Sequence, residues 1–156
     1  MCIRDSYTSP ELFFDNQICQ ATDIWALGCA IYEIVTGYVL FECLGSSRAV
    51  IASTARMLGP FPEPWWSRWE HKERWLKACK KGAKGHKKDS LAWKIQMIGD
   101  PENDRGCLRH PLFESEFLPL PIKEANVLID LLSKMLKHLP QDRITIEEVI
   151  QHPWFA

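Results

Sequence analysis

Residues 22–36 read TDIWALGCAIYEIVT and carry the strongest structural signal of this 156-residue chain. Their apolar side chains recur near the 3.6-residue period of an α-helix, and only Asp23 and Glu33 add charge. A helix that is apolar on nearly every side lies in the middle of a domain. We therefore expect a buried central helix that begins with Thr22 or Asp23 as its N-cap and ends at Gly37.

The sequence beyond this stretch predicts further helices at 47–58, 67–80, 90–98 and 123–139. The last of these places its Leu and Met side chains on one face, and Pro140 ends it. Thr145 and Glu148 match the capping box that begins another helix, which we expect to run to about His152. No segment carries a clear strand pattern, so the sequence predicts a mainly α fold.

The composition excludes several classes of protein. The chain has 19 Lys and Arg against 20 Asp and Glu, and 46% of its residues are hydrophobic. This much apolar surface argues against disorder throughout, and the formal charge of −1 argues against a nucleic-acid binder driven by positive charge. The longest apolar run, 24–32, is shorter than the roughly 20 residues that span a membrane, and we expect no secretory leader.

The six cysteines lack the spacing of a metal site or a redox motif, and the five histidines do not cluster either. We interpret the cysteines as reduced thiols of a cytoplasmic or nuclear protein. Residues 77–88 contain six lysines, and we call this segment the Lys loop. We interpret it as a solvated loop, with a basic docking or localisation patch as the alternative.

Three segments, taken in order, resemble the large lobe of a eukaryotic protein kinase. Tyr7-Thr-Ser-Pro-Glu11 resembles the A-P-E motif that closes the activation segment, and Asp23-Ile-Trp-Ala-Leu-Gly-Cys29 resembles the D-x-W-x-x-G start of the central helix. Residues 131–145, followed by His152-Pro-Trp-Phe155, resemble the end of the domain. The resemblance implies an incomplete C-terminal helical lobe of the protein kinase fold over 7–156.

The resemblance implies structural roles for a set of residues. Glu11 is implied to form a buried ion pair with Arg143, which would tie the activation segment to the last helices. Asp23 is implied to accept backbone N–H bonds from the catalytic loop, although its position also suits a plain helix cap. We interpret Trp25 and Gly28 as packing residues, a bulky anchor and a point of close approach.

Tyr7, Thr8 and Ser9 form the candidate substrate-side loop by the same resemblance. Residues 60–121 contain most of the prolines and five of the seven tryptophans, and they resemble a long insert. Kinases with such an insert include the cyclin-dependent, mitogen-activated and serine/arginine-rich-protein kinases, and this chain most resembles fungal relatives of the last. It departs from that pattern at Thr8, where the group usually has Arg, and at Leu139, where kinases commonly have Asp.

Phosphoryl transfer by a kinase uses a Gly-rich loop, an H-R-D-x-x-x-x-N motif and a D-F-G motif. None of these occurs in the 156 residues, and Ile3-Arg4-Asp5 lies too close to Glu11 to be the catalytic pair. We therefore assign no catalytic, cofactor-binding or metal-binding residue here, and expect ATP and Mg²⁺ to bind only in the complete parent protein. Residues 1–6 are interpreted as a truncated or non-native start.

These observations leave two classes of function. The favoured hypothesis is the C-terminal part of a serine/threonine protein kinase, which transfers the ATP γ-phosphate to protein substrates and is inactive as this piece alone. The alternative is a non-catalytic, kinase-like scaffold. In either case the Trp-rich insert or the Lys loop is a candidate docking site for a protein partner, and we expect neither nucleic acid nor a membrane as a partner.

Overall fold

The computed structural model describes residues 6–41, 47–81, 90–99 and 119–156. Apart from an isolated bridge at Tyr38, these residues contain no strand, which confirms the mainly α prediction. The helices in chain order are α1 (Pro10–Asp15), α2 (Gln20–Thr36), α3 (Ser47–Leu58), α4 (Trp65–Arg68), α5 (Lys72–Lys81), α6 (Leu91–Gln96), α7 (Ile122–Met135), η2 (Pro140–Asp142), α8 (Ile146–Ile150) and η3 (Pro153–Phe155).

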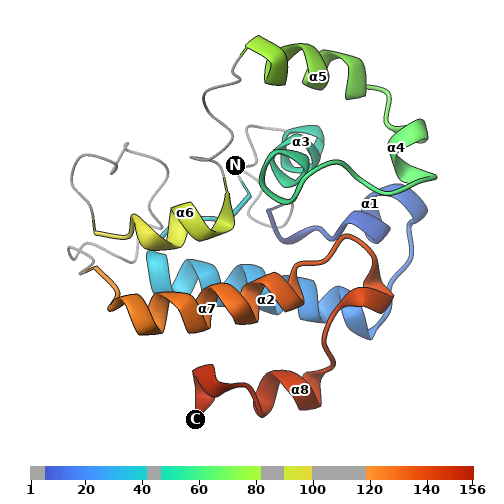
Figure 1. Cartoon of the computed structure of the whole chain (residues 1–156). Helices are drawn as coiled ribbons and strands as arrows, with labels where there is room; N and C mark the ends of the chain where they lie inside the picture. The colour runs from blue at the N-terminus through green and yellow to red at the C-terminus, as the bar shows by residue number, and fades with distance from the viewer. Residues whose placement is uncertain (1–5, 42–46, 82–89, 100–118) are drawn as a thin grey trace.

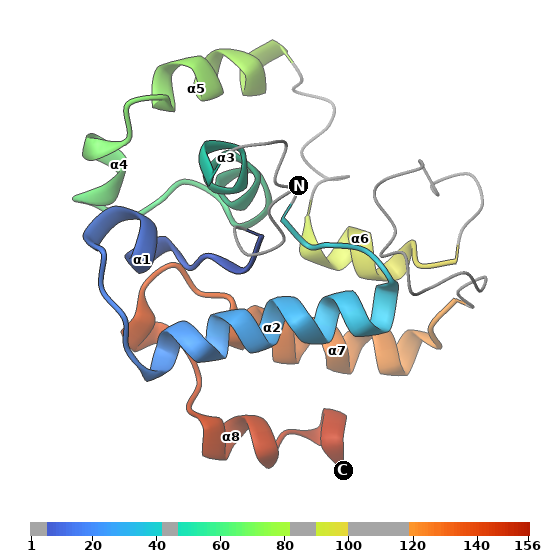
Figure 2. The same ribbon diagram turned by 180° about the vertical axis from the view of Figure 1, so that it is seen from behind.

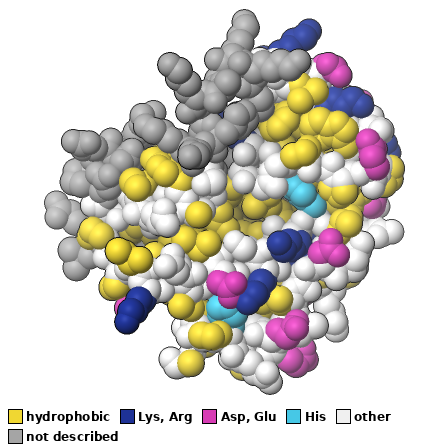
Figure 3. Space-filling view, in the orientation of Figure 1, with side chains coloured by type: hydrophobic (Ala, Val, Ile, Leu, Met, Phe, Trp, Pro, Cys, Tyr) yellow, Lys and Arg dark blue, Asp and Glu magenta, His cyan; other side chains and the backbone are white. Residues whose placement is uncertain are grey.

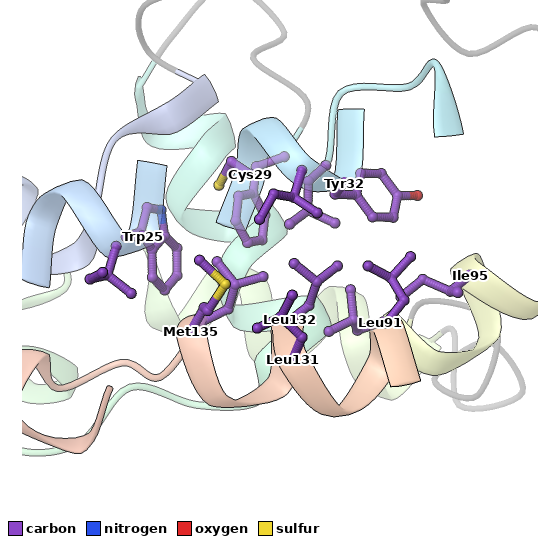
Figure 4. Close-up of a cluster of buried hydrophobic side chains, with 14 of the residues drawn as sticks. Trp25, Cys29, Tyr32, Leu91, Ile95, Leu131, Leu132 and Met135 are labelled. Carbon is purple, nitrogen blue, oxygen red and sulfur yellow. The ribbon is translucent and has the colours of Figure 1, made fainter. Parts of the chain in front are cut away.

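Helices α2 and α7 run side by side through the structure, as both views of the ribbon show (Figures 1 and 2). Helix α6 packs against α7, and α8 lies on the other side of this pair from α3, α4 and α5. In Figure 4 the α2 side chains of Trp25, Cys29 and Tyr32 face those of α6 and α7. We call this cluster the α2–α7 core; its residues include Ile24, Trp25, Cys29, Ile31, Tyr32, Leu91, Ile95, Leu128, Leu131, Leu132, Met135 and Leu136.

Helix α2 is central, but the expectation that it is buried on nearly all sides is wrong for the part of the chain that the structure describes. Leu27 is 36% exposed and Ile34 is 66% exposed. These residues are seven positions apart and therefore lie on one face of the helix. The opposite face, with Trp25 and Tyr32, packs against α7. The apolar period alone does not show which face a neighbouring helix covers.

The start of α2 also differs from the prediction. The helix begins at Gln20 with Cys19 as its N-cap, so neither Thr22 nor Asp23 occupies the cap position. Thr22 stands in the N3 position, where its hydroxyl accepts a hydrogen bond from the backbone N–H of Cys19 at 3.1 Å. The helix ends as predicted, with Gly37 in the left-handed conformation at φ 74°.

Two further boundaries depend on tertiary contacts. The predicted helix 67–80 is divided into α4 and α5, because Trp69 leaves helical geometry and buries its ring against Phe61. The predicted helix 123–139 ends at Met135 rather than at Pro140. The residues after Met135 turn away from the helix, and the carbonyl groups of Lys137 and His138 accept hydrogen bonds from Arg143.

The remaining boundaries agree with the sequence more closely. Helix α3 has the predicted bounds, and Ser90 caps α6 by accepting a hydrogen bond from the backbone of Trp93. Thr145 and Glu148 form the predicted capping box at the start of α8. His152 Nδ1 accepts the backbone N–H of Trp154, and its Nε2 lies 2.9 Å from Asp130, so this histidine fastens the end of the chain to α7.

A second hydrophobic cluster joins α1, α3, α4 and the segment after α7. We call it the aromatic cluster; its residues are Phe13, Phe14, Ile51, Ala52, Ala55, Phe61, Trp65, Trp66, Trp69, Trp75 and Leu139. Figure 3 shows hydrophobic side chains gathered over the region of α3 to α5. The indole and phenyl rings meet mostly edge to face or tilted, the arrangements that aromatic quadrupoles favour.

Several predictions concern residues outside the described parts of the chain. These are most of the candidate start 1–6, the greater part of the Lys loop, and 100–118 of the insert.

Cys19 and Cys29 are free thiols. Within the described residues, no helix is both long enough and apolar enough to cross a membrane.

Candidate functional site

Helix α1 places Glu11 at the candidate site. Ser9 is the extended N-cap residue, and Pro10 suits the first helical turn because its fixed φ matches the helix and its missing N–H is not needed there. Asn16 ends the helix in the left-handed conformation, at φ 51°. The helix has only six residues, too few to be stable without tertiary contacts.

Arg143 and Glu11 form a bidentate ion pair across 132 positions of sequence. Arg143 Nη2 donates to Glu11 Oε2 at 2.6 Å, and Nη1 donates to Oε1 at 2.8 Å. Both side chains are almost completely buried. The structure therefore contains the pair that the sequence predicted, with the parallel geometry in which a guanidinium matches a carboxylate best.

The remaining N–H groups of Arg143 bind backbone carbonyl groups. Nη1 also donates to Ala21 at 2.6 Å, Nε donates to Lys137 at 2.9 Å, and Nη2 also donates to His138 at 3.1 Å. A guanidinium has five N–H donors, and all of them have an acceptor here. Arg143 thus joins α1, the first turn of α2 and the segment after α7, which lie close together in Figures 1 and 2.

The electrostatics of the pair favour its charged form. Burial is the largest single influence on the pKa of Glu11 and by itself would raise it. The hydrogen bonds and the charge of Arg143, together with other hydrogen bonds to the carboxylate, outweigh burial and hold that pKa below its usual value. Thr22 donates a further hydrogen bond to Glu11 Oε1 at 3.0 Å. The guanidinium also lies 5.0 Å from the centre of the Trp25 ring, within the range of a cation–π contact.

The candidate substrate-side loop precedes α1 directly. The Tyr7 hydroxyl donates a hydrogen bond to Glu33 Oε2 of α2, and burial together with this carboxylate raises the pKa of Tyr7. Thr8 is half-buried and Ser9 is buried. Because Tyr7 is held by α2 and Glu11 by Arg143, the residues between them are held at both ends.

Asp23, Trp25 and Gly28 occupy three different environments. Asp23 is exposed in the first turn of α2, and its carboxylate accepts no hydrogen bond from another described residue. Trp25 is completely buried and stacks on Phe41 with 5.4 Å between ring centres. At Gly28 an added Cβ would lie 3.2 Å from Leu136, so this glycine does mark a close approach of helices.

The sequence did not indicate three of the contacts around α1. The hydrogen bond from Thr22 to Glu11 was missed because Thr22 was interpreted as a helix cap. The contacts of Asp15 with Trp65 and Arg68 lie at the other end of α1, 50 or more positions away in sequence. No local pattern marks them, since an Asp near a helix end and an Arg in an insert are both ordinary surface residues.

The described residues contain no group of three or more His, Cys, Asp or Glu side chains placed to hold a metal. No catalytic step is derived from this part of the chain, and the expected role of its residues as structural support of a kinase site stays a prediction.

Comparison with known proteins places this geometry in a family. Residues 1–155 match the family model described as Protein kinase domain. The chain is 31% identical over 150 residues to human "Dual specificity protein kinase CLK2", covering 96% of this chain and 27% of that protein. It is 27% identical over 153 residues to "Serine/threonine-protein kinase AFC2" of Arabidopsis thaliana, covering 96% of this chain and 33% of that protein.

A fission-yeast relative, "Dual specificity protein kinase lkh1" of Schizosaccharomyces pombe, is 25% identical over 150 residues, which cover 96% of this chain and 20% of that protein. The chain thus spans between a fifth and a third of the length of these relatives. Their names do not support the narrower expectation of a fungal, serine/arginine-rich-protein kinase-like group. The helical arrangement around α2 agrees with the C-terminal lobe of a kinase, and the match over 1–155 shows that the chain belongs to the protein kinase domain family.

Proposed function

We propose that this chain is the C-terminal helical part of a protein kinase that transfers the γ-phosphate of ATP to serine and threonine hydroxyls of protein substrates. The observation that carries the proposal is the buried Glu11–Arg143 pair, with every N–H of the guanidinium bonded. Such a pair holds the loop before α1 in one position, which is what a surface that receives a protein substrate requires.

The residues of this chain would position rather than react. Tyr7 and Glu11 hold the two ends of the candidate substrate-side loop, while Asp23 has an exposed carboxylate that is free to accept backbone N–H groups of a catalytic loop. ATP, Mg²⁺ and the residue that accepts the hydroxyl proton would belong to parts of the complete protein that carry the Gly-rich, H-R-D and D-F-G motifs.

The test is a phosphorylation assay of the full-length protein with labelled ATP, Mg²⁺ and arrayed peptides that contain Ser, Thr or Tyr as the only acceptor. We expect label on Ser and Thr peptides. Tyr peptides belong in the array because two of the relatives are named dual specificity kinases. A folded full-length protein that labels no peptide and no copy of itself would instead support the scaffold hypothesis.

A variant pair connects the assay to the observation. Glu11→Gln keeps the shape of the side chain but removes its charge, and we expect it to lower the labelling rate at least tenfold. Arg74→Ala, at an exposed position of α5, is the matched control and should label peptides like the wild type. We also propose a cytoplasmic or nuclear location, which imaging of the tagged full-length protein tests.

A further inference from the structure

The aromatic cluster reaches α1 at the end opposite to the Glu11–Arg143 pair. The Phe14 ring lies nearly parallel to the Trp65 ring of α4, with 5.4 Å between the ring centres and 11° between the planes. Phe14 also meets Phe61 edge to face at 5.1 Å. The last turn of α1 is therefore packed against the insert rather than against the α2–α7 core.

Polar contacts fasten the same end of α1. Trp65 Nε1 donates to Asp15 Oδ2 at 2.6 Å, and Arg68 Nη2 donates to Asp15 Oδ1. Arg68 Nη1 donates to the backbone carbonyl of Phe14 at 3.3 Å. The hydrogen bond from Arg68 lowers the pKa of Asp15, so this carboxylate is charged at neutral pH. Two side chains of α4 thus hold both a side chain and a carbonyl group of α1.

A helix held at one end can turn about that end, whereas a helix held at both ends has a defined direction. The first end of α1 is held by Glu11 and the second by Asp15, so the two attachments are one helix length apart. Ser9, the N-cap residue, continues directly into the candidate substrate-side loop. A change in the direction of α1 therefore moves that loop.

We propose that Arg68 and Trp65 are positioning residues that act through Asp15 to set the direction of α1 and so the position of Tyr7–Ser9. This assigns the Trp-rich insert a role in the substrate-side loop, although the insert does not itself contain that loop. The inference goes beyond the proposed function and rests on it only for the activity readout described below.

Hydrogen exchange of the full-length protein tests whether Arg68 and Trp65 fix the direction of α1, and it needs no assay of activity. Arg68→Ala should speed the exchange of backbone amides in α1 and in the loop before it by about 3- to 10-fold, while α2 and α7 exchange as in the wild type. The expected factor is modest because the Arg68 side chain is 48% exposed and water screens its charge.

Arg74→Ala is the matched control, since Arg74 is an exposed arginine of the neighbouring helix and bonds no other described residue. It should leave the exchange of α1 unchanged. Trp65→Phe is the second variant, because it keeps an aromatic ring against Phe14 but removes the indole N–H donated to Asp15. It should speed exchange in α1 less than Arg68→Ala does, and Arg68→Lys should restore part of the protection.

Three results would overturn the inference. The first is unchanged exchange in α1 of Arg68→Ala, and the second is an equal change in Arg74→Ala. The third is faster exchange throughout α2 and α7 as well, because this would make α4 a general source of stability rather than a positioning element.

The activity readout separates this inference from the proposed function. If the wild type phosphorylates peptides, Arg68→Ala should raise the KM for the peptide about 3- to 10-fold and leave the KM for ATP unchanged. An unchanged peptide KM in this variant contradicts the inference. If the wild type labels nothing while the exchange results are as expected, the proposed function fails and the positioning role of α4 stands.

Discussion

In the α2–α7 core, Leu131, Leu132 and Met135 are completely buried among other apolar side chains, and the contacts carry no preferred direction. In the aromatic cluster, Trp65 is also buried, but it donates a hydrogen bond to Asp15 as well. The stability of the α2–α7 core therefore depends on how well side-chain volume fills it. The stability of the aromatic cluster also depends on where polar atoms are placed. Arg143 contacts Trp25 of the core and Glu11 of α1, and α1 also carries Phe13 and Phe14 of the aromatic cluster.

The largest effect is expected where the two regions meet. Arg143→Ala removes the guanidinium and leaves the buried Glu11 carboxylate without its cationic partner, and we expect a loss of about 3–5 kcal/mol in the free energy of unfolding. The label incorporated into peptides by the full-length protein should fall with it. Denaturant titration and the phosphorylation assay measure the two effects. An unchanged melting temperature and turnover would contradict the role of the Glu11–Arg143 pair in stability and activity.

The double variant Glu11→Leu with Arg143→Met sharpens this first prediction. Replacing a buried ion pair by apolar residues of similar volume is often neutral for stability. We expect the double variant to recover the part of the loss that comes from the unpaired Glu11 carboxylate. The carbonyl groups of Ala21, Lys137 and His138 lose their donor in both variants, so that part of the loss remains. The double variant should not recover the labelling rate, because apolar contacts do not hold α1 in a defined direction.

A change of volume should be most costly in the α2–α7 core. Leu132→Ala leaves a cavity among side chains that have no exposed surface, and we expect it to cost about 2–5 kcal/mol in the free energy of unfolding. The control is Ile150→Ala on α8, whose side chain is 68% exposed and should cost less than about 0.5 kcal/mol. Equal losses in the two variants would contradict the assignment of the core.

Gly28 and Gly59 should resist substitution for different reasons, one for lack of space and the other for its backbone conformation. Gly28 leaves only 3.2 Å between an added Cβ and Leu136, whereas Gly59 has open space but a φ of 92°. We expect substitution at either to cost about 1–2 kcal/mol. At Gly28, Asn should be worse than Ala because it is larger, but at Gly59 Asn should be better than Ala because it tolerates positive φ. Thermal melts that show the same order at both sites would refute this explanation.

The smallest effect expected is a dependence on pH through His138. Its Nε2 lies 3.1 Å from the carbonyl oxygen of Gly59, so Nε2 carries the proton, while Nδ1 is buried and bonds no other described residue. Burial lowers the pKa of His138 below 6.5, and the nearby charge of Arg143 acts in the same direction.

The sign of this pH dependence follows from the number of protons that the folded and unfolded states bind. Below pH 6.5 the unfolded chain binds a proton at this histidine before the folded chain does, so the free energy of unfolding decreases as the pH falls from 6.5 towards the folded pKa. His138→Gln keeps a donor for Gly59 but does not titrate. Urea titrations of both proteins should show a steeper loss for the wild type in this range, and parallel curves would contradict the assignment.

Much of the fold follows from local patterns in the sequence. The bounds of α3, the capping box at Thr145 and the left-handed stop at Gly37 are each decided by a few neighbouring residues. The Glu11–Arg143 pair was predicted for a different reason, since only the resemblance of its two surrounding motifs connected residues so far apart. Its role in supporting a kinase site stays a prediction.

Two of the helix boundaries that were wrong are set by side-chain contacts rather than by helix propensity. The break at Trp69 exists because its ring is buried against Phe61, and the early end of α7 exists because Arg143 takes the carbonyl groups of Lys137 and His138. Neither Trp69 nor Met135 is a helix breaker by its own propensity. The contact partners lie only five to eight positions away, but helix propensity does not indicate that these contacts form.

The sequence by itself determined the class of the fold, the central place of α2 and the motifs that identify the family, because each depends on residues close together in the chain. Only the tertiary structure decided which face of α2 is buried, where α7 ends and how α1 is held at both ends. The attachment of α1 depends on hydrogen bonds between residues 50 to 132 positions apart. The end of α7 depends on hydrogen bonds from Arg143 to carbonyl groups only five and six positions before it. The geometry of all these contacts exists only once the chain has folded.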